Sequence, residues 1–396
     1  MKIDYLVSGL RITLDAVNTS PGPRTHILNF TTALADAGHS TRLIVASQMP
    51  FMGRFSRIPT AAFARSSDAK LLVADGIRLL CALWTGAHTF MRTIGRPAPG
   101  LIYERSAVMQ SLSSFHAAKA RSFRVVEVNG ILSRETAGDR NALKLEGVAR
   151  AIERHVFRSA DLLVAVSENL KVEIIEFAGI ASEKIIVVPN GIAEELVLIE
   201  RNRDVGPTTI GFVGQLSLWQ RLDRLVEAIA RLRDTLPSDA PLVEIIGDGP
   251  ARPILEKLIG ELGLEHQVLL LGRMPQVDAF ARMASWTVGF AGHEKSTSAA
   301  MYHSPLKIYE YAGLGLDVVC TDSRDARELA HSGLRVEFYG DERPLDEALI
   351  AAIGLPSEQS HETEGRRRSL AESHGWAQRV SLVLDAVRQR STQVGA

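Results

Sequence analysis

The feature that most constrains the fold is an alternation of short β-branched apolar runs with longer helical stretches. Residues 3–8 read as a strand, residues 24–38 as a helix that ends at a glycine, and residues 41–46 as the next strand. This alternation is typical of parallel sheets, because parallel neighbours must be joined by a crossover, usually a helix. The pattern therefore predicts an α/β fold.

The alternation is lost after residues 189–191 and then begins again. Residues 194–208 are charged and aperiodic, which favours a linker, and residues 209–213 start a second series. Further strands are predicted at residues 101–103, 124–128, 162–166, 185–188, 242–246, 268–271, 286–290 and 318–320. Further helices are predicted at residues 141–158, 221–236, 252–263, 305–314 and 376–390, and a polar loop at 355–370. Leu143, Val148, Ile152 and Val156 form one apolar stripe of the helix at 141–158.

Two such series predict two Rossmann-like domains, and 396 residues exceed the length that one core usually serves. We assign residues 1–192 to an N-terminal domain, to which a C-terminal helix at about 376–396 returns. Residues 208–375 form the C-terminal domain. Because open parallel sheets bind ligands beyond the carboxyl ends of their strands, we expect the two domains to face each other across a ligand cleft.

Charge is distributed unevenly along the chain. The formal net charge is −1, which argues against nucleic-acid binding by the whole chain. Residues 1–130 carry 15 Lys and Arg against 7 Asp and Glu, a net of +8, so the remainder carries −9. A basic first third suits an anionic ligand, an anionic acceptor or a membrane surface; a solvated face without a partner is the alternative.

The number of cysteines and the length of the apolar runs bear on the cellular compartment in which the protein works. Two cysteines, Cys81 and Cys320, are too few for a disulfide framework or a Cys-rich metal site. The first 15 residues contain no apolar core of signal-peptide length, and no uninterrupted apolar run reaches the roughly 20 residues that span a bilayer. We expect a cytoplasmic protein, with peripheral contact at the inner membrane face as an option.

Glycines follow two neighbouring strands of the second series. Gly211 and Gly214 flank the end of the first strand, and Gly247 and Gly249 follow the next. Glycine lets backbone N–H groups approach a phosphate, and the helix that follows adds its positive N-terminus. An ordinary tight turn explains each pair equally well.

A third element begins at Ser304, which with Pro305 has the residue types of a helix start. Lys307 precedes Glu310 by three residues, so both project from one face of the first two turns. Lys307 would favour a diphosphate there, and Glu310 could accept hydrogen bonds from ribose hydroxyls. The alternative is an exposed Lys–Glu pair.

Taken together, these motifs resemble those of the retaining glycosyltransferases of family 4, which have the two-domain GT-B fold. The resemblance rests on SENL (167–170), VVPNGI (187–192), GFVGQL (211–216), IIGDGP (245–250) and SPLKIYEYAGLGLDVVCTD (304–322). YERS (103–106), EVNGIL (127–132) and Glu135 resemble a subset of that family. The resemblance covers nearly the whole chain and is weakest over residues 50–100.

The resemblance implies roles for particular residues. It implies catalytic roles for Asn129, Glu135 and Lys307. It implies donor contacts for Gly22, Arg24, Gly214, Gln215, Gln220, Arg221, Gly249, Arg273, Met274, His293, Ser304, Pro305, Leu306, Lys307 and Glu310.

Several positions depart from the family pattern. Tyr302 occupies the place of the first glutamate of a paired motif, and Asn129 lies near the place of a sugar-contacting histidine. Gln215 and Gln220 stand where the family has a basic pair, so the neighbouring Arg221 is a candidate for the phosphate contact.

The implied activity is that of a hexosyltransferase with a nucleoside-diphosphate sugar as donor. A UDP-sugar is favoured, and a GDP- or dTDP-sugar is an alternative. We expect no further cofactor and no obligate metal, because His293 and Glu294 are too few ligands for a metal site. The acceptor would be a hydroxyl of a glycan, a lipid-linked intermediate or a small natural product, and nucleic acid is not an expected partner.

Because position 302 offers no carboxylate nucleophile, the resemblance implies front-face displacement, in which the leaving diphosphate helps to deprotonate the acceptor. Three rivals remain. A dinucleotide-dependent oxidoreductase would need a G-x-G-x-x-G motif that neither half contains. A non-catalytic nucleotide-sugar-binding relative would explain the departures, and nucleotide-sugar epimerisation would need no acceptor.

Four features keep alternative interpretations. Gly22 and Arg24, after the first strand, face the phosphates or form a turn with a surface arginine. Glu104 and Arg105, at a strand end, point into the cleft or form an internal salt bridge. Trp219 packs at the domain junction or stacks on a ligand. The stretch 51–72, with Arg54, Arg57, Arg65 and Lys70, meets an acceptor or an anionic membrane, or is a surface loop.

Overall fold

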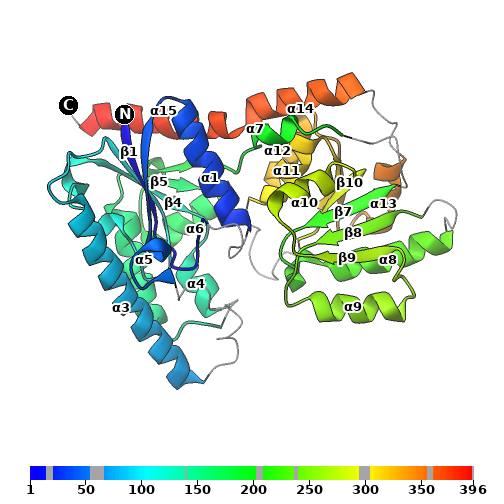
Figure 1. The fold of residues 1–396 in the computed structure, drawn as a ribbon, viewed down its shortest axis with the longest axis horizontal. Coiled ribbons are helices and arrows are strands. Elements are labelled where there is room, and N and C mark those ends of the chain that lie inside the picture. The colour runs from blue at the N-terminus through cyan, green and yellow to red at the C-terminus, as the bar shows by residue number, and fades with distance from the viewer. Residues whose placement is uncertain are drawn as a thin grey trace. The chain divides into compact units, whose positions relative to one another are not determined.

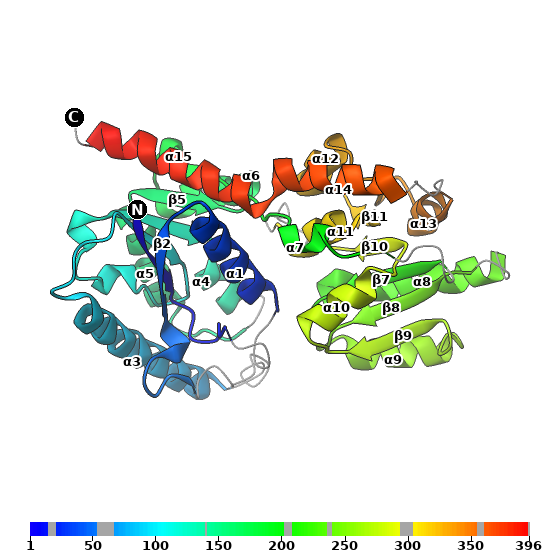
Figure 2. The same cartoon turned by 45° about the horizontal axis from the view of Figure 1, so that its top comes forward.

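The computed structural model describes residues 1–14, 21–53, 67–138, 141–201, 208–235, 240–293, 304–354 and 360–394. The chain divides into two compact units. The first comprises Met1–Pro189, Tyr302–Ser304 and Arg379–Ala396, and the second comprises Asn190–Met301 and Pro305–Gln378. The first unit is thus discontinuous in sequence. Each unit contains one six-stranded sheet with helices packed around it (Figures 1 and 2).

The first unit has a parallel sheet in the order β2-β1-β3-β4-β5-β6. Its strands are β1 (Lys2–Val7), β2 (Ser40–Val45), β3 (Leu101–Arg105), β4 (Phe123–Val128), β5 (Leu162–Ala165) and β6 (Ile185–Val187). Its helices are α1 (Pro21–Asp36), α3 (Asp68–Thr93), α4 (Leu132–Ala137), α5 (Glu146–Ser159), α6 (Glu168–Ala178) and most of α15 (Trp376–Val394). Short 3-10 turns lie at Ala46–Gln48, Ser113–Phe115, Lys119–Arg121 and Ser182–Lys184.

The strands of this sheet are mostly apolar because the sheet is buried on both faces, although β1, β3 and β4 also bury Asp4, Glu104 and Glu127. Every residue of Ile3–Val7 is buried, and so is every residue of β5. The helices begin and end where local chemistry requires it. Ser167 caps α6 by accepting a hydrogen bond from the Leu170 amide at 3.1 Å, and Gly179 ends that helix at φ 60°.

The second unit has a parallel sheet in the order β12-β11-β10-β7-β8-β9. Its strands are β7 (Thr209–Val213), β8 (Leu242–Ile246), β9 (Val268–Gly272), β10 (Val288–Ala291), β11 (Asp317–Thr321) and β12 (Val336–Tyr339). Its helices are α7 (Glu194–Val197), α8 (Leu222–Thr235), α9 (Arg252–Glu261), α10 (Gln276–Met283), α11 (Leu306–Leu314), α12 (Arg324–His331), α13 (Leu345–Ile353) and α14 (Ser360–His374). The 3-10 turn η6 (Leu218–Gln220) precedes α8.

Strand order in the second sheet reverses at β7. The chain runs from β7 to β8 and β9 on one side, then returns to β10, β11 and β12 on the other. Crossovers leave both ways from this point, which opens a crevice beyond the carboxyl ends of β7 and β10. The core below is tightly packed. A Cβ on Gly211 of β7 would lie 1.9 Å from the ring of Trp286, which is fully buried.

The predicted pair of Rossmann-like folds is therefore confirmed, but three local predictions are wrong. The polar stretch at 355–370 is helical from Ser360, because Arg367 is buried and donates to the carbonyls of Gly313 at 2.9 Å and Leu196 at 2.6 Å. The expected linker at 194–208 begins with the short helix α7. Val148 is 42% exposed and does not belong to the buried stripe of α5.

The 26-residue helix α3 was not predicted. It starts within the stretch interpreted as a surface loop, of whose four named cations the structure describes only Lys70. By length and composition, α3 is apolar enough to cross a membrane, although core helices of soluble proteins pass the same test. Its most hydrophobic window is 33% buried within the protein. The sequence analysis missed it because single charged residues, Asp75 and Arg78, interrupt the apolar run.

Candidate functional site

The candidate donor site lies at the carboxyl ends of β7, β8 and β10, and the glycine turns after β7 and β8 pack against each other there. A Cβ on Gly247, whose φ is 137°, would lie 1.8 Å from the Gly214 carbonyl oxygen. A Cβ on Gly249 would lie 2.4 Å from the Leu216 carbonyl oxygen. These glycines are therefore required by close backbone contact.

The amides of these glycines are already used inside the fold. The Gly214 N–H donates to the Ile246 carbonyl at 3.0 Å, and the Gly249 N–H donates to Asp248 Oδ1 at 2.8 Å. These two N–H groups therefore have partners within the fold, and the predicted donor contacts of Gly214 and Gly249 stay predictions. The turns bring the chain close to the site. Gln215, between them, is exposed.

Lys307 is the central cation of the site. It lies in the first turn of α11, is 8% exposed, and donates from Nζ to Gln220 Oε1 at 2.7 Å. The ammonium also lies 4.0 Å from the centroid of the Phe212 ring. A Cβ on Gly214 would come within 3.7 Å of Nζ. The alternative of an exposed Lys–Glu pair is thus excluded for Lys307.

The partner of Lys307 is a neutral amide, and this affects its ionisation. Burial lowers the pKa of Lys307 to about 7, although the nearby carboxylate of Glu310 acts to raise it. Burial likewise raises the pKa of Glu310 to about 7, against the effect of Lys307. Each group favours the charged form of the other, and an incoming anion would favour the charged form of Lys307 further.

The start of α11 differs from the prediction in its capping residue. Pro305 occupies the N-cap position, the helix begins at Leu306, and no side chain caps its first amides. Ser304 was expected to be the cap and is instead a buried residue grouped with the first unit. A helix start without a side-chain cap suits an anion, because its N–H groups and dipole are positive.

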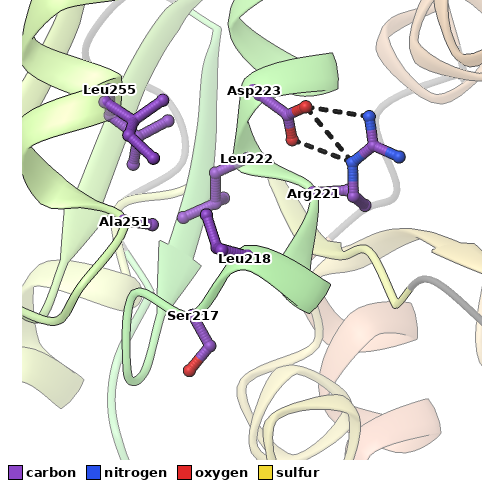
Figure 3. Close-up of a pocket in the computed structure, with 8 residues that line it drawn as sticks. Ser217, Leu218, Arg221, Leu222, Asp223, Ala251 and Leu255 are labelled. Carbon is purple, nitrogen blue, oxygen red and sulfur yellow. Dashed lines mark hydrogen bonds and ion pairs between the residues drawn. The ribbon is translucent and has the colours of Figure 1, made fainter. Parts of the chain in front are cut away.

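Arg221 forms an ion pair with the carboxylate of Asp223. Its Nε lies 3.0 Å from Asp223 Oδ1 and its Nη2 lies 2.8 Å from Oδ2 (Figure 3). Burial acts to raise the pKa of Asp223, but hydrogen bonds and charge from Arg221 outweigh it and hold that pKa below its ordinary value. The positive charge of Arg221 is therefore largely balanced by Asp223.

A small pocket of about 180 Å³ lies beside this ion pair, between η6, α8 and α9. Figure 3 shows Leu218, Leu222, Ala251 and Leu255 contributing carbon atoms to its wall. Of the predicted diphosphate contacts, Arg221 lines this pocket, whereas Lys307 and Gln220 do not.

Three further predicted donor residues lie on the loops after β9 and β10. The side chain of Arg273 is 78% exposed, with its Nε 3.8 Å from Asp248 Oδ2, and Met274 next to it is half-buried. His293, after β10, is 6% exposed, and its ring lies 5.2 Å from that of Trp219, centroid to centroid. Trp219 itself is 47% exposed. The pair forms an aromatic surface in the second unit.

The first unit contains a second polar cluster, centred on Glu127 at the end of β4. Glu127 is 1% exposed and lies 3.0 Å from His26 Nε2. It accepts hydrogen bonds from the Tyr103 hydroxyl at 3.0 Å, from Asn129 Nδ2 at 2.7 Å and from Arg105. Burial opposes ionisation, but the charges of His26 and Arg105 outweigh it and hold the pKa of Glu127 far below its ordinary value.

This cluster fixes the orientation of Asn129. Because its side-chain nitrogen donates to Glu127, its amide oxygen points elsewhere and can accept a hydrogen bond. Arg105 forms an internal ion pair, although with Glu127 and not with Glu104. Glu104 is fully buried and accepts from the Ser111 hydroxyl at 2.9 Å and the Leu112 amide at 2.6 Å.

The remaining predicted residues of the first unit lie on α1 and α4. Gly22 is half-buried, and a Cβ there would meet no atom within 4 Å, so packing does not explain its being glycine. Arg24 donates from Nε to the Leu14 carbonyl at 2.9 Å. Glu135, on α4, is 8% exposed. Glu153 accepts from the Ser133 amide at 3.1 Å, so it satisfies the start of α4.

Sequence reasoning missed His26, Glu127, Phe212 and Gly292. A Cβ on Gly292 would lie 2.7 Å from the Gln220 carbonyl oxygen, so this glycine lets the β10 loop approach η6. A detectable signal existed for Glu127, a lone carboxylate in the apolar run FRVVEV. Among the described residues, no group of three His, Cys, Asp or Glu side chains could hold a metal ion.

Family models match both halves of the chain. Residues 22–196 match the model described as Glycosyltransferase Family 4, and residues 198–363 match Glycosyl transferases group 1. A 2-deoxystreptamine glucosyltransferase of Streptomyces kanamyceticus is 26% identical over 181 residues, covering 41% of this chain and 46% of that protein. That match therefore spans slightly less than half of the relative.

Solved structures resemble the whole chain in fold. The apo form of the lipopolysaccharide outer core galactosyltransferase WaaB has 17% identity and a TM-score of 0.60, covering 98% of this chain and 100% of that chain. WaaG, a glycosyltransferase involved in lipopolysaccharide biosynthesis, has 15% identity, coverage of 97% and 99%, and a TM-score of 0.64. Anabaena Alr3699/HepE in complex with UDP and glucose has 16% identity, full coverage of both chains and a TM-score of 0.56.

The two sheets, their strand order and these structural likenesses define the GT-B fold. Together with the two domain matches, they place the chain among glycosyltransferases of the GT-B type.

Proposed function

We propose that the protein transfers a hexose from a nucleoside-diphosphate sugar to a hydroxyl acceptor with retention of anomeric configuration, and that the donor is a UDP-sugar. The observation that carries the proposal is Lys307, a buried cation in the first turn of α11 whose hydrogen-bond partner is the neutral Gln220. Its charge is therefore left to stabilise an incoming diphosphate. The Anabaena neighbour in complex with UDP and glucose supports the choice of base.

In the proposed reaction, the bond between the anomeric carbon and the diphosphate oxygen breaks, and the acceptor oxygen forms a bond to the same face of that carbon. The acceptor proton passes to a diphosphate oxygen, which leaves as the nucleoside diphosphate. Lys307 and the start of α11 stabilise the charge that develops on the leaving group. Glu310 accepts hydrogen bonds from the ribose hydroxyls.

Residues of the first unit would orient the acceptor and complete the phosphate contacts. The amide oxygen of Asn129, which Glu127 holds in one orientation, accepts a hydrogen bond from a sugar hydroxyl. Glu135 binds a second hydroxyl. Arg24 and Gly22 are the first-unit residues that the resemblance assigns to the diphosphate. The acceptor is a sugar or aminocyclitol hydroxyl, since the matched Streptomyces relative is a 2-deoxystreptamine glucosyltransferase.

A binding and turnover experiment tests the proposal. The purified chain is screened by thermal shift against UDP, GDP, dTDP, ADP and NAD. A nucleotide that binds the folded chain, present at about 100 times its dissociation constant, should add about 2.7 kcal/mol to the free energy of unfolding. Lys307→Met and Glu310→Ala should abolish the response to UDP. Lys257→Met, an exposed lysine of α9 in an i,i+4 pair with Glu261, is the matched control and should respond as the native chain does.

Turnover is then measured as UDP release from UDP-glucose with 2-deoxystreptamine as the first acceptor, and product configuration is read by NMR. An α-linked product from the α-linked donor supports retention, whereas a β-linked product refutes front-face displacement. Chelation should leave the rate unchanged, because no metal step is proposed. A thermal response to NAD but to none of the diphosphates would refute the transferase.

A second candidate is a non-catalytic nucleotide-sugar-binding protein. Gln220 favours it, because a neutral residue stands where the resemblance expects a cation to help the leaving group depart. The measurement that separates the two is UDP release with a panel of hydroxyl acceptors. Binding of UDP-glucose without release in any of them, together with normal folding, would favour the binding protein.

A further inference from the structure

Helix α3 (Asp68–Thr93) turns its most apolar side to the solvent. Its buried side is mixed: Asp75, Thr85 and Thr89 are fully buried and Thr93 is 2% exposed, beside the smaller apolar contribution of Leu71, Ala74 and Cys81. Its opposite side is apolar, with exposures between 40% and 68%. We call these residues the outer face of α3: Leu72, Val73, Ile77, Leu80, Leu83, Trp84, Phe90 and Met91. A surface helix of a protein surrounded by water normally has the reverse arrangement.

The polar side of α3 is fixed in place by satisfied contacts, so the helix cannot turn its outer face inward. Asp75 accepts from the amides of Lys144 and Leu145, each at 2.8 Å, and pairs with Arg78. Arg78 in turn donates to the Ala142 carbonyl at 2.8 Å. Rotation of the helix would leave this buried carboxylate without partners, which costs more than exposing the leucines.

Close packing on the same side has the same effect. A Cβ on Gly86 would lie 2.6 Å from the Phe115 ring, so only a glycine lets α3 approach this closely. The hydroxyls of Thr85, Thr89 and Thr93 each donate to the carbonyl four residues earlier, at 2.8 Å. Thr85 and Thr93 also accept hydrogen bonds, from Gln110 Nε2 at 2.8 Å and from the Ala117 amide at 3.0 Å. The outer face therefore stays exposed, and α3 runs along the outside of the first unit in both views (Figures 1 and 2).

An aromatic pair extends the outer face beyond the helix. Phe51 is 69% exposed, and its ring centroid lies 6.0 Å from that of Trp84. Phe51 adopts φ 68°, a left-handed conformation that is unfavourable for a bulky residue. The Trp84 indole N–H donates to the Pro50 carbonyl at 3.1 Å, which keeps the two rings together. The chain thus holds an aromatic ring outward despite a backbone penalty.

The charges around the outer face are of one sign. Between residues 69 and 121, the only acidic residues are Asp75 and Glu104, and both are fully buried. The exposed charged residues of the same stretch are all basic: Lys70, Arg92, Arg96, Lys119 and Arg121. The one acid at the helix start, Asp68, is paired with Lys144 at 2.6 Å. An apolar strip with cations at both ends complements a surface that is apolar inside and anionic outside.

We propose that the outer face of α3 docks on an anionic phospholipid bilayer, with the helix lying in the interfacial plane. It does not span the bilayer, because its other side carries Asp75 and Arg78 and is packed on the protein. Leucine and aromatic side chains enter the headgroup–acyl boundary, and the flanking cations contact the lipid phosphates. A second copy of the chain is disfavoured as the occupant, since either pairing direction would bring cations against cations.

Vesicle binding by the full chain tests this proposal. We expect co-sedimentation with phosphatidylcholine vesicles that contain about 30 mol% phosphatidylglycerol and much weaker binding to phosphatidylcholine alone. Leu80→Glu/Leu83→Glu should weaken binding at least about 20-fold, since two leucines no longer enter the bilayer. The matched control is Val148→Glu/Val172→Glu, two valines that are 42% and 54% exposed on other helices of the first unit, and it should bind normally.

A charge variant tests the second part of the argument. Arg92→Gln/Arg96→Gln should weaken binding to the anionic vesicles roughly 10- to 30-fold at low salt. All variants change exposed side chains, so melting temperature and circular dichroism should match the native chain. Failure of the native chain to bind anionic vesicles would overturn the proposal. An equal loss of vesicle binding in Leu80→Glu/Leu83→Glu and in Val148→Glu/Val172→Glu would also overturn it. So would a dimer in lipid-free solution that Leu80→Glu/Leu83→Glu dissociates.

Discussion

Proton uptake by Lys307 should make the stability of the ligand-free protein depend on pH in a characteristic way. Burial lowers the pKa of Lys307 to about 7, whereas an unfolded lysine titrates near 10.4. Between these values the unfolded chain binds one more proton than the folded chain. The free energy of unfolding therefore rises with pH in this window, by up to about 1.36 kcal/mol per pH unit.

The magnitude follows from the two pKa values. Between pH 7.5 and pH 9.5, the contribution of Lys307 to the free energy of unfolding should become more favourable by roughly 2.5 kcal/mol. Other groups titrate in the same range, so the relevant quantity is the difference between the native chain and Lys307→Met. Urea unfolding followed by tryptophan fluorescence at both pH values measures it, with Lys257→Met as the control.

Two outcomes decide the interpretation. A native-minus-Lys307→Met difference that grows by about 2 kcal/mol or more confirms a lysine whose charged form is disfavoured in the folded state. Parallel profiles for the two proteins would refute it, because Lys307 would then keep its ordinary pKa despite its burial beside Gln220. Saturating UDP should flatten the difference, since a bound diphosphate would restore the charge of Lys307.

Two further substitutions test the packing and the polar cluster. Gly247→Ala should destabilise the protein by at least about 3 kcal/mol in urea unfolding, because its Cβ would lie 1.8 Å from the Gly214 carbonyl oxygen at an unfavourable φ. Gly365→Ala, in α14 with no atom near the new methyl group, should instead raise the free energy of unfolding by about 0.5 to 1 kcal/mol. A similar loss of stability in both variants would refute the steric argument. Glu127→Gln should cost about 3 kcal/mol or more, because Arg105 loses its buried carboxylate partner, and calorimetry showing an unchanged melting temperature would contradict this.

The architecture could be predicted from sequence because it depends on periodicity and on punctuation by glycine and proline. Strands buried on both faces, such as β5, appear as continuous apolar runs, and the restart at residue 209 marks the second sheet. The failures have a common cause in tertiary contact. The helix α14 is held through Arg367, whose carbonyl partners are 54 and 171 residues away in sequence. No local pattern reports such a contact.

Sequence patterns predicted which residues belong to the candidate site better than they predicted how those residues are arranged. Lys307 and Gln220 were both singled out, but their direct hydrogen bond could not be foreseen, since 87 residues separate them. The ion pair between Arg221 and Asp223 was missed although the two residues are only two positions apart, because a turn at φ 49° sets the geometry. The outward position of the most apolar side of α3 was also missed, because periodicity alone does not say which face is inside.

The discontinuity of the first unit bears on how the protein is synthesised. Val380, Val383, Leu384 and Val387 of α15 are at most 5% exposed and belong to that unit, yet they are synthesised only after the whole of the second unit. The ribosome must add most of the 207 residues after Pro189 first, which at ordinary elongation speeds takes roughly 10 to 40 s. During that interval the nascent N-terminal sheet lacks its last covering helix. The second unit, closed by Gln378, can bury its core earlier, so the domain begun first is the one completed last.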